Sequence, residues 1–254
     1  MQDTQAPPVQ EQPSEEVAAL AAGQELGALR ASFGPKRMSG GALAGLIGMC
    51  LLGLALFVLP GLFFVWLLVR SPNLNRKQAA KRLHCFEHGL VVSGRDGRPV
   101  AFRWDTAAVL QRITRRYVNG VHTGTTYLYT LYTPDGSAIE LTGFYADPEV
   151  WGAAVQHEIT RAQLPRTLDL LRNGGTARFG DITVNAAGMA NAKRGSLAWS
   201  EVQRVEVKNG VVFVGKAGKL LAWSNTPVHR IPNFFLFLAV VEELRGAAVG
   251  VRCN

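Results

Sequence analysis

The sequence is poor in cysteine and lacks the short motifs that mark common catalytic and metal sites. A GxSxG elbow, a GxxxxGKS/T phosphate loop and a GxGxxG loop are all missing, and Arg161 stands where an HExxH motif would need its second histidine. A sparse, odd number of cysteines without a CxxC pair argues against a disulfide framework and suits a reducing compartment. We therefore expect no enzymatic activity, no cofactor and no metal site. The three cysteines are Cys50, Cys85 and Cys253.

Charged residues are absent from residues 40–69, which read GGALAGLIGMCLLGLALFVLPGLFFVWLLV. About 20 apolar residues suffice for a helix to cross a hydrocarbon core of about 30 Å. The segment begins too far into the chain, and is too long, for a cleaved signal peptide. We therefore expect a single transmembrane helix over residues 38–70. The alternatives are a helix that is kinked at Pro60-Gly61 and a re-entrant hairpin that turns there. The hairpin would leave both ends of the segment on the same side of the membrane.

Acidic residues are scarce just after this segment. Residues 70–117 carry eleven Lys and Arg against three acids, whereas residues 1–36 carry two bases against five acids. The positive-inside bias predicts a single-pass protein of the cell membrane with its C-terminal region in the cytoplasm. A membrane surface explains this placement of charge better than nucleic acid does, so no nucleic-acid partner is expected. The flanking bases are Arg70, Arg76, Lys77, Lys81 and Arg82.

The N-terminal arm, residues 1–36, has few large apolar residues. Residues 1–18 are rich in Gln, Glu and Pro, a composition that cannot bury enough surface to offset the entropy of ordering. We expect a mostly disordered acidic arm, with a weak helix over residues 16–33. Within the apolar segment, Gly41 and Gly45 form a small-xxx-small pair of the kind that allows close helix packing, so a homodimer through this helix is conceivable.

The region after the apolar segment predicts short strands and two helices. Asn119-Gly120 and Asp135-Gly136 are strong turn signals between strand-like runs. Asp147-Pro148 predicts the start of a helix that ends near Leu164-Pro165, and a second apolar helix is expected from about residue 232 to 245. Trp104, Trp151, Trp199 and Trp223 are expected to pack in or at the rim of the core.

The order of these elements occurs twice. The run FRWDTAAVLQRI at residues 102–113 aligns with LAWSEVQRVEV at 197–207, which places Trp104 opposite Trp199. A period of about ninety to a hundred residues is longer than a solenoid unit and indicates a duplicated domain. We expect one domain over residues 75–164 and a second over residues 174–247.

Several segments resemble uncharacterised bacterial membrane proteins with PH-like domains. They are RLHCFEHGLVV, the Trp104 and Trp199 strands, TARFGDITVNAAGM and IPNFFLFLAVVEEL, within roughly residues 75–246. The resemblance implies a mainly β, α+β chain whose two units are each an antiparallel barrel or sheet closed by a C-terminal helix. It implies no particular activity, since fold does not fix function.

Three arginines precede the Asn119-Gly120 turn. If this run is a strand, Arg112 and Arg116 share one face and Arg115 takes the other. In PH-like folds, basic residues near the first hairpin loops can hold anionic head groups, so these residues are candidate contacts for an anionic ligand or lipid. The alternative interpretation is a solvated strand face.

Two hypotheses of function follow. The first is a non-enzymatic, membrane-anchored interaction protein whose tandem PH-like domains bind a protein, a peptide or an anionic lipid at the cytoplasmic face. The second is a structural or assembly subunit of a larger membrane complex.

Overall fold

The computed structural model describes residues 12–56, 58–93 and 97–250. The chain forms two compact units. The first contains the described residues up to Ala101 together with Gly143–Pro148, and the second contains Phe102–Thr142 and the residues from Glu149 onward. The predicted folding domains over residues 75–164 and 174–247 stay predictions, because compactness alone does not test independent folding.

The first unit is built on a four-stranded antiparallel sheet in the order β1-β2-β3-β4. Strand β1 pairs with β2 although about fifty residues separate them, and Ser32 lies opposite His84. The Ser14 side chain caps α1 by accepting a hydrogen bond from the backbone N–H of Val17. The elements are α1 (Glu15–Gly23), β1 (Leu29–Phe33), β2 (Leu83–Phe86), β3 (Gly89–Ser93) and β4 (Pro99–Arg103).

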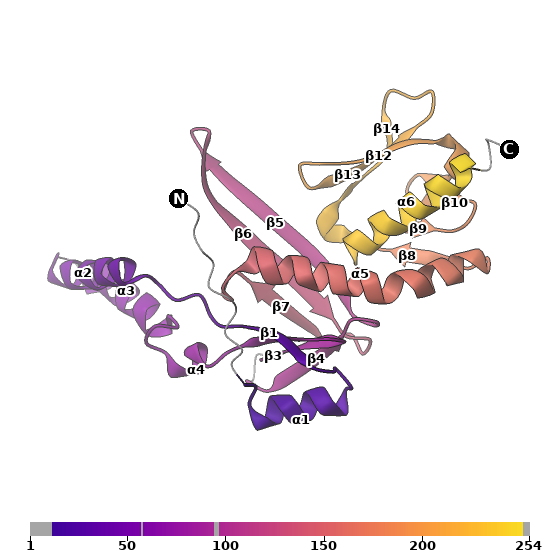
Figure 1. The fold of residues 1–254 in the computed structure, drawn as a ribbon. Helices are drawn as coiled ribbons and strands as arrows, with labels where there is room; N and C mark the ends of the chain where they lie inside the picture. The colour runs from indigo at the N-terminus through magenta and orange to yellow at the C-terminus, as the bar shows by residue number, and fades with distance from the viewer. Residues whose placement is uncertain (1–11, 57, 94–96, 251–254) are drawn as a thin grey trace, which may run out of the picture. The chain divides into compact units, whose positions relative to one another are not determined.

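The apolar segment lies between β1 and β2 and forms two helices, α2 (Gly40–Leu56) and α3 (Val58–Arg70), followed by the short helix α4 (Arg76–Ala79). Helices α2 and α3 lie side by side as a helical hairpin (Figure 1). The residue between them, at position 57, lies outside the described residues. Pro60 lies in the first turn of α3, where a missing backbone N–H costs nothing because that group has no intrahelical partner.

The single transmembrane helix expected over residues 38–70 is therefore wrong. None of the helices in the described parts of the chain combines the length and the apolarity that a bilayer crossing requires. Helix α2 has 17 residues, which at 1.5 Å per residue is about 25 Å, against a hydrocarbon core of about 30 Å. The single-pass localisation in the cell membrane and the orientation of the chain depended on that helix and are corrected with it.

The second unit begins with a three-stranded antiparallel sheet, β5-β6-β7, followed by a long helix. Strands β5 and β6 meet at Asn119-Gly120, where both residues have positive φ, as a type I′ hairpin turn requires. The helix continues through Pro165 rather than ending there as predicted. Trp151 on this helix is fully buried and packs edge-on against Tyr129 at 5.2 Å between ring centroids. The elements are β5 (Ala108–Val118), β6 (Val121–Tyr132), β7 (Ala138–Thr142) and α5 (Pro148–Arg172).

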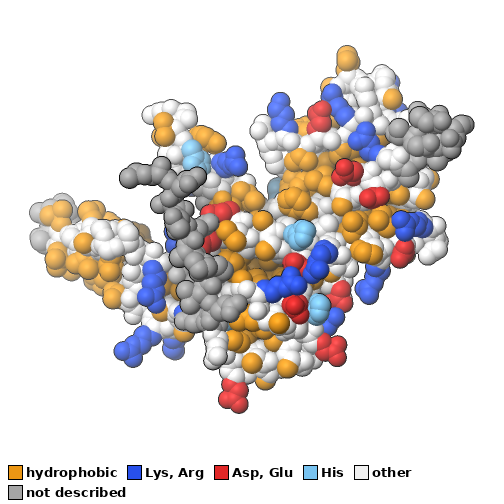
Figure 2. All heavy atoms as spheres, in the orientation of Figure 1, with side chains coloured by type: hydrophobic (Ala, Val, Ile, Leu, Met, Phe, Trp, Pro, Cys, Tyr) orange, Lys and Arg blue, Asp and Glu red, His pale blue; other side chains and the backbone are white. Residues whose placement is uncertain are grey.

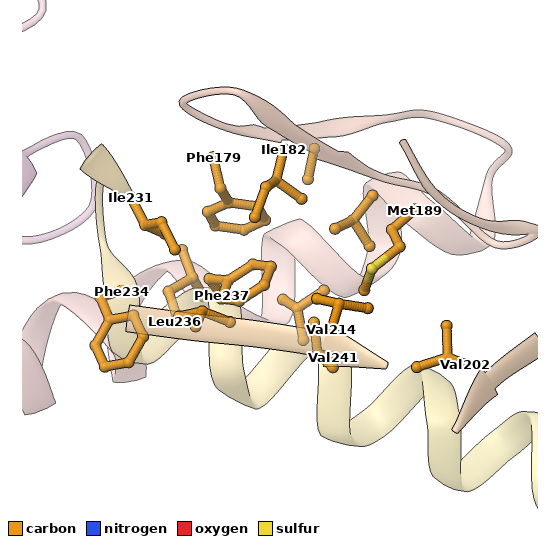
Figure 3. Close-up of a cluster of buried hydrophobic side chains, with 14 of the residues drawn as sticks. Phe179, Ile182, Met189, Val202, Val214, Ile231, Phe234, Leu236, Phe237 and Val241 are labelled. Carbon is orange, nitrogen blue, oxygen red and sulfur yellow. The ribbon is translucent and has the colours of Figure 1, made fainter. Parts of the chain in front are cut away.

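The C-terminal part of the second unit contains two more antiparallel sheets and a helix. One sheet has the order β11-β10-β9-β8 and the other β12-β13-β14. Figure 3 shows aromatic and aliphatic side chains from the strands meeting those of the helix, with Phe179 and Phe237 5.4 Å apart in an edge-on contact. The elements are β8 (Ala177–Phe179), β9 (Ile182–Val184), β10 (Gly188–Asn191), β11 (Gly195–Ala198), β12 (Val202–Lys208), β13 (Val211–Lys216), β14 (Ala222–Pro227) and α6 (Phe234–Gly250).

One buried amide ties the parts of the second unit together. Asn233, at the start of α6, accepts a hydrogen bond from the N–H of Val109 at 2.7 Å. Its side-chain nitrogen donates to the carbonyl of Ala107 at 3.1 Å and to the side chain of Gln163 at 2.9 Å. A single side chain therefore connects β5, α5 and the start of α6.

The predicted PH-like barrels are wrong for the described parts of the chain. The strands form four small separate sheets, and none of them closes on itself. The order of elements nevertheless occurs twice, as a four-stranded sheet, a three-stranded sheet and a helix. Three tryptophans expected in the core are buried there, namely Trp104, Trp151 and Trp199.

Candidate functional site: an apolar helical hairpin with a basic base

The hairpin α2–α3 exposes large apolar side chains on both of its helices. Figure 2 shows hydrophobic side chains covering it, with Lys and Arg where it joins the rest of the unit. Leu59 is 81% exposed, and Phe63 and Trp66 are each more than half exposed. A helix on the surface of a water-soluble domain normally has a polar face, and neither helix has one. The exposed large apolar residues are Ile47, Met49, Leu51, Leu52, Leu54, Leu59, Leu62, Phe63, Trp66, Leu67 and Val69.

Two glycines allow the helices to pack closely. A Cβ atom on Gly61 would lie 2.5 Å from the backbone nitrogen of Leu54, and one on Gly53 would lie 3.0 Å from the Cα of Gly61. Small residues at such crossings let two backbones approach. A Cβ atom on Gly41 or Gly45, the pair expected to mediate homodimerisation, would meet nothing within 4 Å. That pair is therefore open in this chain, and the homodimer stays a prediction.

The two ends of the hairpin are fastened to each other. The side chain of Asn73 accepts a hydrogen bond from the N–H of Met38 at 3.0 Å and donates one to the Met38 carbonyl at 3.3 Å. The Ser39 hydroxyl accepts from the N–H of Ala42 at the start of α2. The chain consequently enters and leaves the hairpin at one base.

Positive charge gathers at this base. Between Gly34 and Arg82 the sequence has no Asp or Glu. Because the hairpin returns to its start, the basic residues before it and those after it lie at the same end. A single helix would place them at opposite ends. Arg70 lies over the ring of Trp66, 5.0 Å from its centroid. The basic residues at this end of the hairpin are Lys36, Arg37, Arg70, Arg76, Lys77, Lys81 and Arg82.

An open pocket of about 910 Å³ lies beside α4. Lys77, Lys81 and Arg82 line it together with the buried His84, whose Nδ1 is 2.7 Å from the hydroxyl oxygen of Ser32. Glu16 also lines the pocket, so its charge is mixed. The side chain of Arg82 is held in place by donating to the carbonyls of Ala79 and Lys81.

The three predicted arginines lie on the second unit, on strand β5. Arg112 pairs with Leu128 of β6, Arg115 with Thr125 and Arg116 with Gly124. All three are exposed, and none forms an ion pair with another described residue. From Arg112 to Val118 every residue of β5 is exposed, and the end of the two-stranded ribbon that β5 forms with β6 exposes Tyr117, Val118 and Val121.

The root of this ribbon is also positively charged. His229, on the short turn of helix at Val228–Arg230, has its pKa lowered by burial and further by the charges of Arg112 and Arg230. Neighbours that lower the pKa of a histidine are a sign of uncompensated positive charge. Sequence reasoning identified Arg112 but not its two partners, which lie more than a hundred residues away in the chain.

The described residues contain no cluster of three or more His, Cys, Asp or Glu side chains that could hold a metal ion. His84 and His88 show why their spacing does not make a site, since His84 is buried against Ser32 and His88 is exposed. Two buried tyrosines also have strongly shifted pKa values, and both have a structural role. Burial raises the pKa of both Tyr129 and Tyr145 to about 12.

The family of unknown function DUF6585 matches residues 14–248, and the chain belongs to this family. No curated protein and no solved structure matches the chain. The resemblance to bacterial PH-like membrane proteins stays a prediction.

Proposed function

We propose that this member of the DUF6585 family is a non-enzymatic binding protein that docks on anionic lipid surfaces through the helical hairpin α2–α3. One observation carries the proposal. A hairpin without a single charge over residues 40–69 begins and ends at a base with seven Lys and Arg, within a stretch of sequence from Gly34 to Arg82 that has no acid. In this arrangement the hairpin enters the lipid from one side and returns to it, so no helix needs to cross.

The apolar surface supplies the driving force. Fully burying a large aliphatic or aromatic side chain contributes about 1.5–3 kcal/mol. Leu59, Leu62 and Phe63 alone are each more than half exposed to solvent in the free chain. Apart from their terminal turns, both helices satisfy their own backbone hydrogen bonds, which is what an apolar solvent demands of an inserted segment.

The basic residues at the two ends of the hairpin provide the selectivity for negatively charged lipids. A Lys or Arg near an anionic leaflet contributes about 1 kcal/mol, and this attraction weakens within a Debye length of the surface. Lys36, Arg37, Arg70, Arg76 and Lys77 are all exposed. Insertion of the hairpin would bring them to the level of the head groups, where basic residues are typical of a lipid interface.

The two-stranded ribbon formed by β5 and β6 also supports binding of anionic lipid, by residues of the second unit. Between Thr106 and Pro134 the sequence has no acid, and the ribbon carries Arg112, Arg115 and Arg116. We keep these residues as candidate contacts for anionic head groups.

Vesicle flotation with the full chain tests the proposal. The protein should float with vesicles of phosphatidylcholine containing phosphatidylglycerol, float less with phosphatidylcholine alone, and lose part of its binding at high salt. The variant Leu59→Glu/Phe63→Glu should fail to float. The matched control Val150→Glu adds the same kind of charge at an exposed apolar position of α5 and should float as the wild type does.

Two results would reject lipid docking. One is the absence of flotation at low salt with the anionic vesicles. The other is a stable complex between the hairpin and a second protein that persists with vesicles present, which would support the alternative role of an assembly subunit instead.

A further inference from the structure

The two most exposed large apolar side chains of the described residues lie in the loop between β13 and β14. Leu220 is 100% exposed and Leu221 is 85% exposed. They are adjacent, they lie at the tip of a strand connection, and they belong to the second unit rather than to the hairpin. Two adjacent leucines with this exposure bury little apolar area within the fold, and their surface is accessible to a partner.

Hydrogen bonds and an ion pair fix the stem of this loop. The N–H of Ala217 donates to the carbonyl of Glu201 at 2.8 Å, and the N–H of Lys219 donates to the carbonyl of Lys216 at 3.1 Å. The Lys216 ammonium lies 2.8 Å from the carboxylate of Glu201. Gly218 has φ +71°, a conformation that favours glycine. These bonds fix the stem of the loop, and the leucines extend beyond it.

The strands β13 and β14 and the loop between them carry basic residues and no acid. Between Val207 and Val241 the sequence contains no Asp or Glu, while it contains Lys208, Lys216 and Lys219. Lys216 is neutralised by Glu201, but Lys219, directly before the two leucines, forms no ion pair with a described residue. A basic residue beside a small apolar tip is complementary to an anionic interface with acyl chains beneath it.

We infer that this loop is a second lipid contact, which inserts Leu220 and Leu221 at the boundary between head groups and acyl chains while Lys219 binds an anionic head group. The inference rests on the proposed function, because it assigns the same lipid surface as the ligand.

Two measurements on the full chain test the loop. In the first, Leu220→Ser/Leu221→Ser should weaken binding to phosphatidylglycerol-containing vesicles about tenfold, since it removes most of the apolar area of the tip. The matched control Val207→Ser changes a half-exposed apolar residue on β12 and should leave the binding unchanged. In the second, an environment-sensitive fluorophore on Leu220→Cys, in a chain that carries Cys253→Ser, should shift its emission to the blue when these vesicles are added.

The outcomes separate this inference from the proposed function. If the chain floats and Leu59→Glu/Phe63→Glu abolishes flotation, but the fluorophore does not shift and the leucine variant binds normally, the loop inference is overturned while the hairpin proposal stands. If the chain does not float at all, both fall. If the leucine variant changes self-association and leaves vesicle binding unaltered, the loop binds a second copy, which also overturns the inference.

Discussion

The hairpin and the C-terminal core are both made of strongly apolar sequence, yet their side chains have opposite environments. In α6, Phe237 and Val240 are fully buried under the strands β8 to β14. In α2 and α3, residues of the same types are exposed, and in the described parts of the chain the two helices pack mainly against each other. The contrast shows that apolarity alone does not determine burial. A helix becomes part of a core only where other elements cover its apolar surface, and the described residues leave much of the apolar surface of the hairpin uncovered.

The largest expected effect comes from deleting an aromatic ring on each side of this comparison. Phe237→Ala should lower the free energy of unfolding by about 3–5 kcal/mol, because it leaves a cavity in the core. Phe63→Ala should change it by no more than about 0.5 kcal/mol, because that ring is already 56% exposed. Denaturant unfolding in mild detergent measures both. Equal losses would mean that the hairpin is a core of its own, and the comparison would fail.

The next largest effect concerns the amide that connects β5, α5 and α6. Asn233→Ala removes three side-chain hydrogen bonds from a buried position and should lower the free energy of unfolding by about 3 kcal/mol. Asn225→Ala, at an exposed position of β14, should have little effect. Thermal unfolding followed by circular dichroism compares the two. An unchanged midpoint for Asn233→Ala would show that the second unit does not depend on this connection.

A smaller effect is expected where the two helices of the hairpin touch. Gly61→Ala places a methyl group against the backbone of Leu54 and should cost about 1–3 kcal/mol of hairpin stability. Gly45→Ala meets no other atoms within 4 Å and should slightly favour the helix, since alanine is the better helix former. The rate of chymotrypsin cleavage within residues 40–70 should rise for the first variant only. Faster cleavage of both would place the helix contact elsewhere.

The smallest effect is electrostatic and lies in the second unit. Arg112→Ala should raise the pKa of His229 toward its ordinary value of 6.5, because one of the charges that lowers it is gone. The pKa of His229 is lower in the folded chain than in the unfolded chain, so its protonation favours unfolding as the pH falls below about 6.5. The variant should therefore lose less stability over that window. An NMR titration of His229 measures the shift, and Arg115→Ala should leave it unchanged.

Local signals in the sequence predicted the local structure well. Asn119-Gly120 formed the hairpin turn that its residue types require, and Pro148 begins a helix as expected. The positions of the strands β5, β6 and β7 also followed from runs of β-branched and aromatic residues between these turns. These features depend on neighbours within a few residues, which a single sequence displays.

Features that depend on distant partners were missed. Residues 29–33 were expected to continue a helix, but they form β1 because β2 offers a pairing edge about fifty residues later. Helix α5 continues past Pro165 because Leu171 is buried in the C-terminal core and Leu168 packs against it, which offsets the lost hydrogen bond.

The candidate site was predicted only in part. The apolar run and its basic flank could be read from the sequence, and Pro60-Gly61 indicated a hairpin as the alternative to a single helix. The position of the turn was not predicted, because Pro60 and Gly61 lie inside α3 and the close approach of Gly61 to the backbone of Leu54 depends on the packing of the two helices. The exposed leucines of the β13–β14 loop were missed because two leucines in sequence normally indicate a core.

The central claim is that the partner missing from the hairpin is lipid. Quenching of Trp66 fluorescence by phosphatidylglycerol vesicles with brominated acyl chains tests it directly, because only a residue among the acyl chains is quenched. If the hairpin inserts into lipid, the tryptophan fluorescence of the full chain should be strongly quenched, and this quenching should be largely lost in Trp66→Phe. No quenching, or quenching that Trp66→Phe leaves intact, would contradict it.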